Sequence, residues 1–311
     1  MCRGLTGALL GVFLVLVVSA AFAQPVWVVV STEVDEDFDP AGFQDRQALR
    51  LDVATGYTWP GSIFFDPGPG VLGLETGLDA FHYDLLKDVC FFSTEVDVAV
   101  DDLIFEDEDL LMWDGVAVTE VFDVKNLQTA AGGPLTLDYG LDAITYFEHA
   151  ELGDVWAFST EVDIQPLGVT AGDVVFTDGT NVLGTWNVQQ AFDHEVGLDA
   201  LHILTREEGP DRITYEFILS TEVDGSVFNP DPQQWIPFKN EDILMLVFDL
   251  GNNLLEADVP WRGTDSYPDQ GFDHDVGLDA LYLGPEIPEP ATMLLTGLGL
   301  SALVLRFRRR R

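Results

Sequence analysis

The chain alternates short apolar runs with acidic and glycine-containing turns, a pattern that predicts β-strands rather than helices. Four runs rich in valine and aromatic residues lie at residues 26–30, 89–92, 155–158 and 215–219. A second set lies at residues 109–113, 173–176 and 242–246, with 63–65 as the expected counterpart near the N-terminus. A return strand is expected at 181–186, and a last strand of each unit begins at a Gly-Leu-Asp-Ala motif, as at 198–204. Apart from the two termini, no segment keeps an apolar period of 3.6 residues, so we expect an all-β fold.

Two short motifs alternate along the chain, each in four copies. Ser-Thr-Glu-Val-Asp begins at residues 31, 93, 159 and 220, and Gly-Leu-Asp-Ala begins at residues 77, 140, 197 and 277. The first motif recurs at intervals of 62, 66 and 61 residues. Such regular self-similarity indicates tandem structural units. We expect four repeats of about 62 residues, starting near residues 26, 88, 154 and 215.

Four strands in each of four units predict a four-bladed β-propeller, a fold in which radial repetition protects the edges of the sheets. In that arrangement the last strand, residues 278–283, pairs with the first, residues 26–34. Two packed β-sandwiches or an open β array are the alternatives that the sequence leaves open.

The N-terminus has the three parts of a secretory signal peptide. Arg3 supplies the positive charge, residues 9–18 form the apolar stretch, and Ala-Phe-Ala at 21–23 is a cleavage site. We therefore expect residues 1–23 to be removed by cleavage between Ala23 and Gln24. The mature chain then has one cysteine, Cys90, which lies in an apolar run and is expected to be buried.

The C-terminus combines a short acidic-proline motif, an apolar run and a basic cluster. Pro288, Glu289 and Pro290 precede the apolar residues 291–305, and the basic cluster ends in Arg308, Arg309, Arg310 and Arg311. This order resembles the PEP-CTERM sorting signal of Gram-negative bacteria. The resemblance implies export through the inner membrane and recognition by the membrane protease-transpeptidase exosortase. It also implies a place at the cell surface, outer envelope or extracellular matrix of a host that secretes exopolysaccharide.

The length of the apolar run bears on how this tail, residues 288–311, is used. Its fifteen residues are short against the roughly 20 that span a bilayer. We therefore expect a short transmembrane segment that holds the chain in the membrane before processing, rather than a permanent anchor.

The domain between the two signals, residues 24–287, is strongly acidic. Of 54 acidic residues only Glu289 lies outside it, and of 14 basic residues six do, which leaves 53 acids against 8 bases and a net charge of −45. Nucleic acids and anionic lipids are poor partners for such a domain. Divalent cations, cationic surfaces and neutral glycans are compatible with it, and the candidate partners are exopolysaccharide and other surface proteins.

The repeated motifs contain the candidate ligands for a cation. Carboxylate oxygens are the ligands that Ca²⁺ prefers, and in an extended Ser-Thr-Glu-Val-Asp the Glu and Asp side chains share one face. The alternative is that the acids cap turns, because folding requirements recur in every repeat. The candidates are Glu33, Asp35, Glu95, Asp97, Glu161, Asp163, Glu222 and Asp224 in the first motif, and Asp79, Asp142, Asp199 and Asp279 in the second.

No catalytic motif stands out, so the sequence predicts a non-enzymatic protein of the cell surface or matrix. His82, His194, His202 and His274 recur beside the Gly-Leu-Asp-Ala motif and are interpreted as turn or surface residues. Trp59, Trp235 and Trp261 lie in proline-containing contexts from which they can stack on sugar rings. The alternative functions are a secreted hydrolase of glycans or esters and a Ca²⁺-dependent glycan-binding module.

Overall fold

The computed structural model describes residues 26–31, 44, 46–52, 62–68, 76–100, 103–207, 213–262 and 278–285. Within these ranges the protein is all-β and its sheets are small and antiparallel. The helical elements in the same ranges are two 3₁₀ turns, η2 (Val124–Asn126) and η3 (Gln189–Ala191). The predicted all-β class is confirmed.

Four sheets have four strands each. In strand order, the first sheet consists of β20 (Ala280–Pro285), β1 (Val26–Ser31), β2 (Ala48–Asp52) and β3 (Ser62–Phe65), and the second of β4 (Phe81–Asp84), β5 (Val89–Phe92), β8 (Asp109–Trp113) and β9 (Val118–Asp123). The third sheet consists of β10 (Ala143–His149), β11 (Gly153–Ser159), β12 (Val174–Thr177) and β13 (Val182–Trp186). The fourth consists of β14 (Ala200–Glu207), β15 (Ile213–Ser220), β18 (Ile243–Asp249) and β19 (Leu254–Trp261). Two further hairpins are β6 (Val98–Val100) with β7 (Leu103–Phe105), and β16 (Gly225–Asn229) with β17 (Gln234–Phe238).

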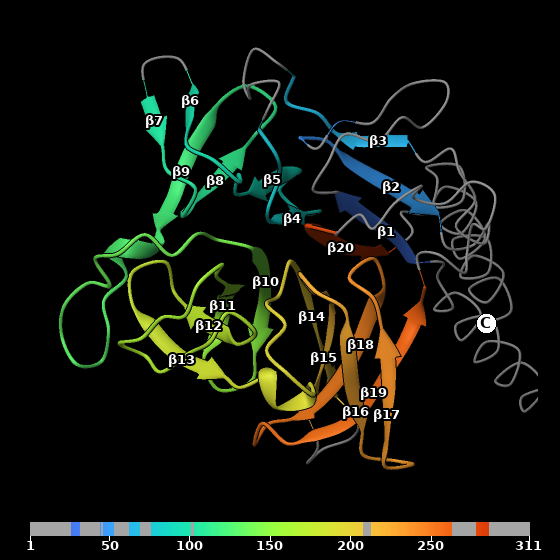
Figure 1. The fold of residues 1–311 in the computed structure, drawn as a ribbon. Coiled ribbons are helices and arrows are strands. Elements are labelled where there is room, and N and C mark those ends of the chain that lie inside the picture. Colours follow the sequence, from blue (N-terminus) through green and yellow to red (C-terminus); the bar gives the residue numbers. More distant parts are fainter. Residues whose placement is uncertain are drawn as a thin grey trace, which may run out of the picture.

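The strand that follows a Gly-Leu-Asp-Ala motif is the first strand of each four-stranded sheet. These strands are β4, β10, β14 and β20, and Figure 1 shows them at the centre, with the four sheets arranged around them. Contacts join β20 to β4, β4 to β10, β10 to β14 and β14 to β20. The predicted pairing of the last strand with the first is confirmed, because Val28 lies opposite Leu283 and Val30 opposite Leu281.

The predicted assignment of strands in the first sheet is wrong in one respect. Residues 63–65 belong to β3, the outer strand, while the third strand is β2, which the sequence pattern did not indicate. The stretch Ala48–Asp52 carries Arg50 and Asp52 among three apolar residues, so it lacks the continuous apolar run that marked the corresponding strands. Arg50 instead lies over the ring of Trp27, 4.8 Å from its centroid.

Among the described residues the core forms four clusters, each between two neighbouring sheets. Leu78 and Phe92 pack with Trp27 between the first and second sheets, and Phe91 packs with Phe158 between the second and third. The third and fourth sheets enclose Trp186 and Phe217, while residues of β1, β14 and β20 pack together in the remaining cluster. Each fully buried large side chain contributes about 1.5–3 kcal/mol through removal of apolar surface from water. Cys90 is buried, as predicted.

The serine of each Ser-Thr-Glu-Val-Asp motif links one sheet to the next. Its side-chain Oγ donates a hydrogen bond to the carbonyl oxygen of the leucine in the following Gly-Leu-Asp-Ala motif. The four bonds are Ser31 to Leu78 (3.2 Å), Ser93 to Leu141 (2.6 Å), Ser159 to Leu198 (2.9 Å) and Ser220 to Leu278 (2.5 Å). All four serines are buried, so a position that looks like a turn residue in the sequence is a contact between sheets.

Substitution of one of these serines should weaken the contact between two sheets. We expect Ser159→Ala to lower the free energy of unfolding by about 1–3 kcal/mol, because the carbonyl of Leu198 loses a buried donor. Chemical denaturation measures the loss, and Ser226→Ala, at a half-buried serine of β16, serves as the control. Equal stabilities of the two variants would show that the hydroxyl of Ser159 does not stabilise the fold.

Candidate functional site

The aspartates of the four Gly-Leu-Asp-Ala motifs are all buried just before the central strands. Asp79, Asp142, Asp199 and Asp279 precede β4, β10, β14 and β20, and their exposed fractions are 9%, 6%, 8% and 5%. Burial raises the pKa of Asp142 well above its ordinary value, and the negative charges of Asp79 and Asp199 raise it further. The carboxylates of different repeats therefore act on one another.

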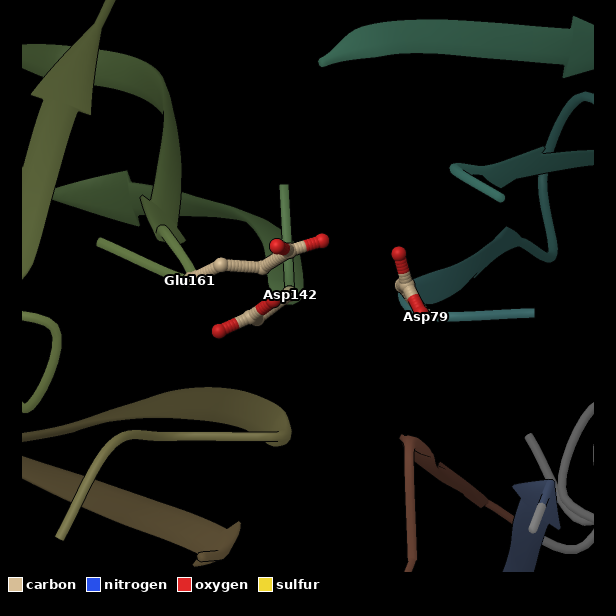
Figure 2. A group of neighbouring side chains, drawn as sticks. All are labelled: Asp79, Asp142 and Glu161. Atoms are coloured by element: carbon tan, nitrogen blue, oxygen red, sulfur yellow. The ribbon is translucent and has the colours of Figure 1, made fainter. Parts of the chain in front are cut away.

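One group of three carboxylates is especially close. Asp79, Asp142 and Glu161 each offer an oxygen, and these oxygens lie within 4.8 Å of one another. Figure 2 shows the side chains of Asp142 and Glu161 beside each other, with Asp79 facing them from the neighbouring sheet. The Oδ2 atoms of Asp79 and Asp142 are buried and have no hydrogen-bond partner. Burial, followed by the charges of Glu95 and Glu161, raises the pKa of Asp79 well above its ordinary value.

The glycine of the motif leaves room for the glutamate of the paired motif. A Cβ at Gly77, Gly140 or Gly197 would collide with the carboxyl groups of Glu95, Glu161 and Glu222, respectively. Gly140 and Gly197 also adopt positive φ angles of 60° and 50°, which favour glycine. Gly and Glu therefore form one structural unit that directs the glutamate side chain toward the aspartates.

The aspartate of Ser-Thr-Glu-Val-Asp serves a different purpose. Asp163 Oδ1 accepts the backbone N–H of Ala171 at 3.3 Å, and Asp224 Oδ1 accepts that of Asn240 at 3.0 Å. These two acids cap loops, which is the structural alternative that the sequence left open. Asp97 is exposed on the surface. Glu33 and Asp35 lie outside the described residues.

The expectation that the Ser-Thr-Glu-Val-Asp motif is an extended strand is wrong. The strand ends at Phe92, Ser159 or Ser220, and the chain bends at the following Glu-Val pair. Within each bend, the threonine hydroxyl donates to the carbonyl of the valine two residues later, as in Thr160 to Val162 at 2.9 Å. This local bond turns the backbone, so the motif is not a continuous strand with alternating side chains.

An open pocket of about 660 Å³ adjoins the carboxylate group. It lies between the third and fourth sheets, and its acidic lining residues are Glu161, Asp163, Glu195 and Glu222. Glu161 is exposed and therefore connects the two buried aspartates with the wall of the pocket. The pocket gives this face a concave, negatively charged opening.

A second group of acids was not predicted. Asp107, Glu108 and Asp138 offer oxygens within 4.8 Å of one another. Burial raises the pKa of Glu108 to about 8, and a side-chain hydrogen bond to Asp138 and the negative charge of Asp138 add to this rise. Lys125 Nζ lies 2.8 Å from Glu108 Oε1 and also contacts Glu106. The run Glu-Asp-Glu-Asp at 106–109 was the available signal, and here the protein itself supplies the positive charge.

Two of the repeat-related histidines are buried at the centre, which corrects their interpretation as turn or surface residues. His82 on β4 and His202 on β14 lie in parallel planes with centroids 6.3 Å apart, and Tyr282 of β20 contacts both rings edge-on. Burial lowers the pKa of His82 to about 3 and that of His202 to about 4. His194 is exposed and bonded to Asp193, and His274 lies outside the described residues.

Of the three tryptophans expected to stack on sugar rings, the structure places one at the surface and one in the core. Trp235 is 50% exposed on β17 and its ring contacts Phe228 with centroids 5.3 Å apart. Trp261 is buried in the core, so its interpretation as a surface residue is wrong. Trp59 lies outside the described residues.

Comparison with known proteins identifies the tail. Residues 286–311 match the family model described as the PEP-CTERM protein-sorting motif, which confirms the predicted resemblance. The motif implies export, sorting to the envelope or surface of a bacterial cell, and processing by exosortase. The predicted membrane segment, residues 291–305, lies outside the described residues. In the described ranges no helix has both the length and the apolar character needed to cross a bilayer.

The remaining comparisons contribute little. No curated protein matches the chain. Among solved structures, the chain is similar to the extracellular domain of the putative hybrid two component system BT4673 from B. thetaiotaomicron, at 10% identity and a TM-score of 0.30. The match covers 85% of this chain and 38% of that one. Similarity at this level indicates nothing about a shared function.

Proposed function

We propose that the protein is an exported, non-enzymatic component of the cell surface or extracellular matrix of a Gram-negative bacterium, associated with exopolysaccharide or a biofilm. The observation that carries this proposal is the sorting motif at residues 286–311, which places the domain outside the cytoplasm. In the proposed layout, residues 1–23 are the signal peptide, 24–287 the functional domain and 288–311 the sorting tail.

The proposal includes a closed ring of four sheets as the blades of a β-propeller. Three observations support it: the central strands contact one another in a cycle, a core cluster lies between each pair of neighbouring sheets, and a serine joins each sheet to the next. In such a ring the first and last strands of the chain pair with each other, so neither leaves an unpaired sheet edge, which suits a protein that persists outside the cell.

A non-enzymatic role is supported by the way the repeated acids and histidines are used. Asp163 and Asp224 cap loops, and His82 and His202 pack against aromatic rings in the interior. Residues repeated in this way stabilise the architecture. A surface role as a spacer or scaffold requires a stable, highly charged domain, and the net charge of −45 over residues 24–287 keeps such domains apart in solution.

A second candidate function, glycan binding, is favoured by one observation. Trp235 exposes half of its surface on the β16–β17 hairpin, and its ring contacts that of Phe228, its partner on the neighbouring strand. Exposed tryptophan rings present flat apolar faces of the kind that stack on sugars. Exopolysaccharide pull-down with Trp235→Ala as the comparison tests this function, and a screen of purified protein against glycan and ester substrates tests the hydrolase alternative.

Deletion of residues 288–311 should abolish surface sorting. We expect the truncated protein to appear in the periplasm or medium while its folded domain keeps the melting temperature of the full-length protein. Fractionation with immunoblotting measures the distribution, and Glu289→Gln with the arginine cluster intact separates the motif from the charge. Unchanged surface retention of the deletion variant would contradict the proposed sorting.

A further inference from the structure

We propose that Asp79, Asp142 and Glu161 bind a single Ca²⁺ ion that joins the second and third sheets. This site goes beyond the proposed surface function and does not depend on it. Of the twelve repeated acids that the sequence offered as ligands, the structure brings these three together.

The geometry requires a positive charge or protons in this position. Asp79 precedes β4 in the second sheet, while Asp142 and Glu161 lie before β10 and after β11 in the third. The oxygens of the three carboxylates lie within 4.8 Å of one another, and Asp79 and Asp142 are buried while Glu161 is exposed, so the repulsion is strongest between the two aspartates. Two of their oxygens, Asp79 Oδ2 and Asp142 Oδ2, are buried without a hydrogen-bond partner. Burying a carboxylate in this way is costly unless it is paired or coordinates a metal.

The contrast with the second acid group favours a bound cation. Around Glu108 the fold brings in Lys125, whose ammonium lies 2.8 Å from the buried carboxylate. The charges that act most strongly on Asp79 and Asp142 are all carboxylates, from Glu95, Glu161, Asp107, Asp199 and Glu222. The site therefore gathers negative charge, and among the residues that the structure describes no lysine or arginine is paired with Asp79, Asp142 or Glu161.

The distances and ligand types favour Ca²⁺ over other divalent ions. All the candidate ligand atoms are carboxylate oxygens, which Ca²⁺ accepts at about 2.3–2.6 Å, so oxygens on opposite sides of the ion lie about 4.6–5.2 Å apart. Mg²⁺ requires distances of about 2.0–2.1 Å in a near-ideal octahedron and gives up its water reluctantly, so three carboxylates drawn from two sheets suit it less well than they suit Ca²⁺. The pocket beside Glu161 opens to solvent and provides room for the water molecules that complete the coordination shell.

One ion rather than one per repeat is expected. In the part of the chain that the structure describes, two groups of three acids bring their oxygens within 4.8 Å, and Lys125 lies against the other one. The acids of the remaining repeats, although related by sequence, are not gathered to the same degree in these ranges. A single ion would therefore bind at only one of the four contacts between neighbouring sheets.

Calcium binding to the intact mature protein tests the proposal. After removal of metals with chelator, isothermal titration with CaCl₂ should give about one site per chain. At Ca²⁺ about 100-fold above the dissociation constant, the melting temperature should rise by about 5–10 °C. MgCl₂ and NaCl of matched ionic strength should each have a much smaller effect.

Substitutions distinguish Ca²⁺ binding at this site from a general effect of Ca²⁺ on the acidic surface. Asp142→Asn with Glu161→Gln should remove the Ca²⁺-specific rise, whereas the charge-matched pair Glu148→Gln with Glu256→Gln, both exposed, should keep it. Equal shifts with Ca²⁺, Mg²⁺ and NaCl would overturn the proposal, as would a full Ca²⁺ response of the first pair. If that pair does not fold, the titration of the wild-type protein decides alone, and zero bound Ca²⁺ rejects the site.

Discussion

Removal of residues 277–287 from the mature domain is expected to unfold all four sheets together. Those residues contain β20, which pairs with β1 along its whole length and contacts both β4 and β14. Leu278, Leu281 and Tyr282 are buried in two of the core clusters, and Leu278 accepts the bond from Ser220. Without this strand, the first sheet loses its central member and the fourth loses its neighbour.

Hydrogen exchange distinguishes the closed ring from an open array. In an open array stability is roughly a sum over units and their nearest-neighbour interfaces, so the truncation should affect only the adjoining strands. The ring predicts loss of protection in every sheet, including β10–β13, which lies opposite the deletion. A truncation that stops after residue 287 serves as the control and should remain folded. Protection retained in the second and third sheets would contradict closure.

The two buried histidines at the centre of the fold, His82 and His202, should make the protein acid-sensitive. Burial lowers the pKa of His202 from its ordinary value of 6.5 to about 4, so the folded state keeps this ring neutral where the unfolded chain protonates it. Unfolding then takes up a proton between these two pH values, and the stability contributed by neutral His202 is lost as the pH falls through that window. The shift corresponds to about 3 kcal/mol.

His202→Leu isolates this contribution. The ring packs against His82 and Tyr282, and its Nδ1 has no hydrogen-bond partner, so an apolar side chain of similar size can replace it. Relative to wild type, the variant should gain about 3 kcal/mol in unfolding free energy between pH 7 and pH 4. Denaturation at a series of pH values measures this, and Ile203→Val, which removes no titrating group, should cost a constant amount. Parallel pH profiles of wild type and His202→Leu would contradict the prediction.

Much of the strand content follows from local sequence. The run Val89–Phe92 is apolar and β-prone over its whole length, and Tyr215–Leu219 is so apart from the buried Glu216, because these strands are covered on both faces by neighbouring sheets. The strand β2 was missed because Arg50 interrupts its apolar pattern, and that arginine is accommodated by a contact with Trp27 that no local rule reveals. The hairpins β6–β7 and β16–β17 were missed as well, since they alternate with exposed residues at the surface.

The sequence predicted that the candidate site is built of acidic residues, but it did not predict which of these residues lie together. The repeats identified Asp79, Asp142 and Glu161 among twelve acids, yet their convergence depends on the placement of two sheets and on a bend caused by the hydroxyl of Thr160. After the same bend, Asp163 caps a loop by accepting the backbone N–H of Ala171, so Glu161 and Asp163 of one motif have separate roles. The burial of His82 and His202 likewise results from four central strands meeting, which is a tertiary property.

Intact mass measurement of the protein recovered from the cell envelope tests the central claim, export followed by sorting, most directly. The account predicts an N-terminus at Gln24 and a C-terminus that lacks the apolar residues 291–305 and the arginines beyond them, because the motif at 286–311 implies processing by exosortase. A mature protein that retains Arg308 to Arg311, or one recovered with Met1 from the cytoplasm, would contradict it.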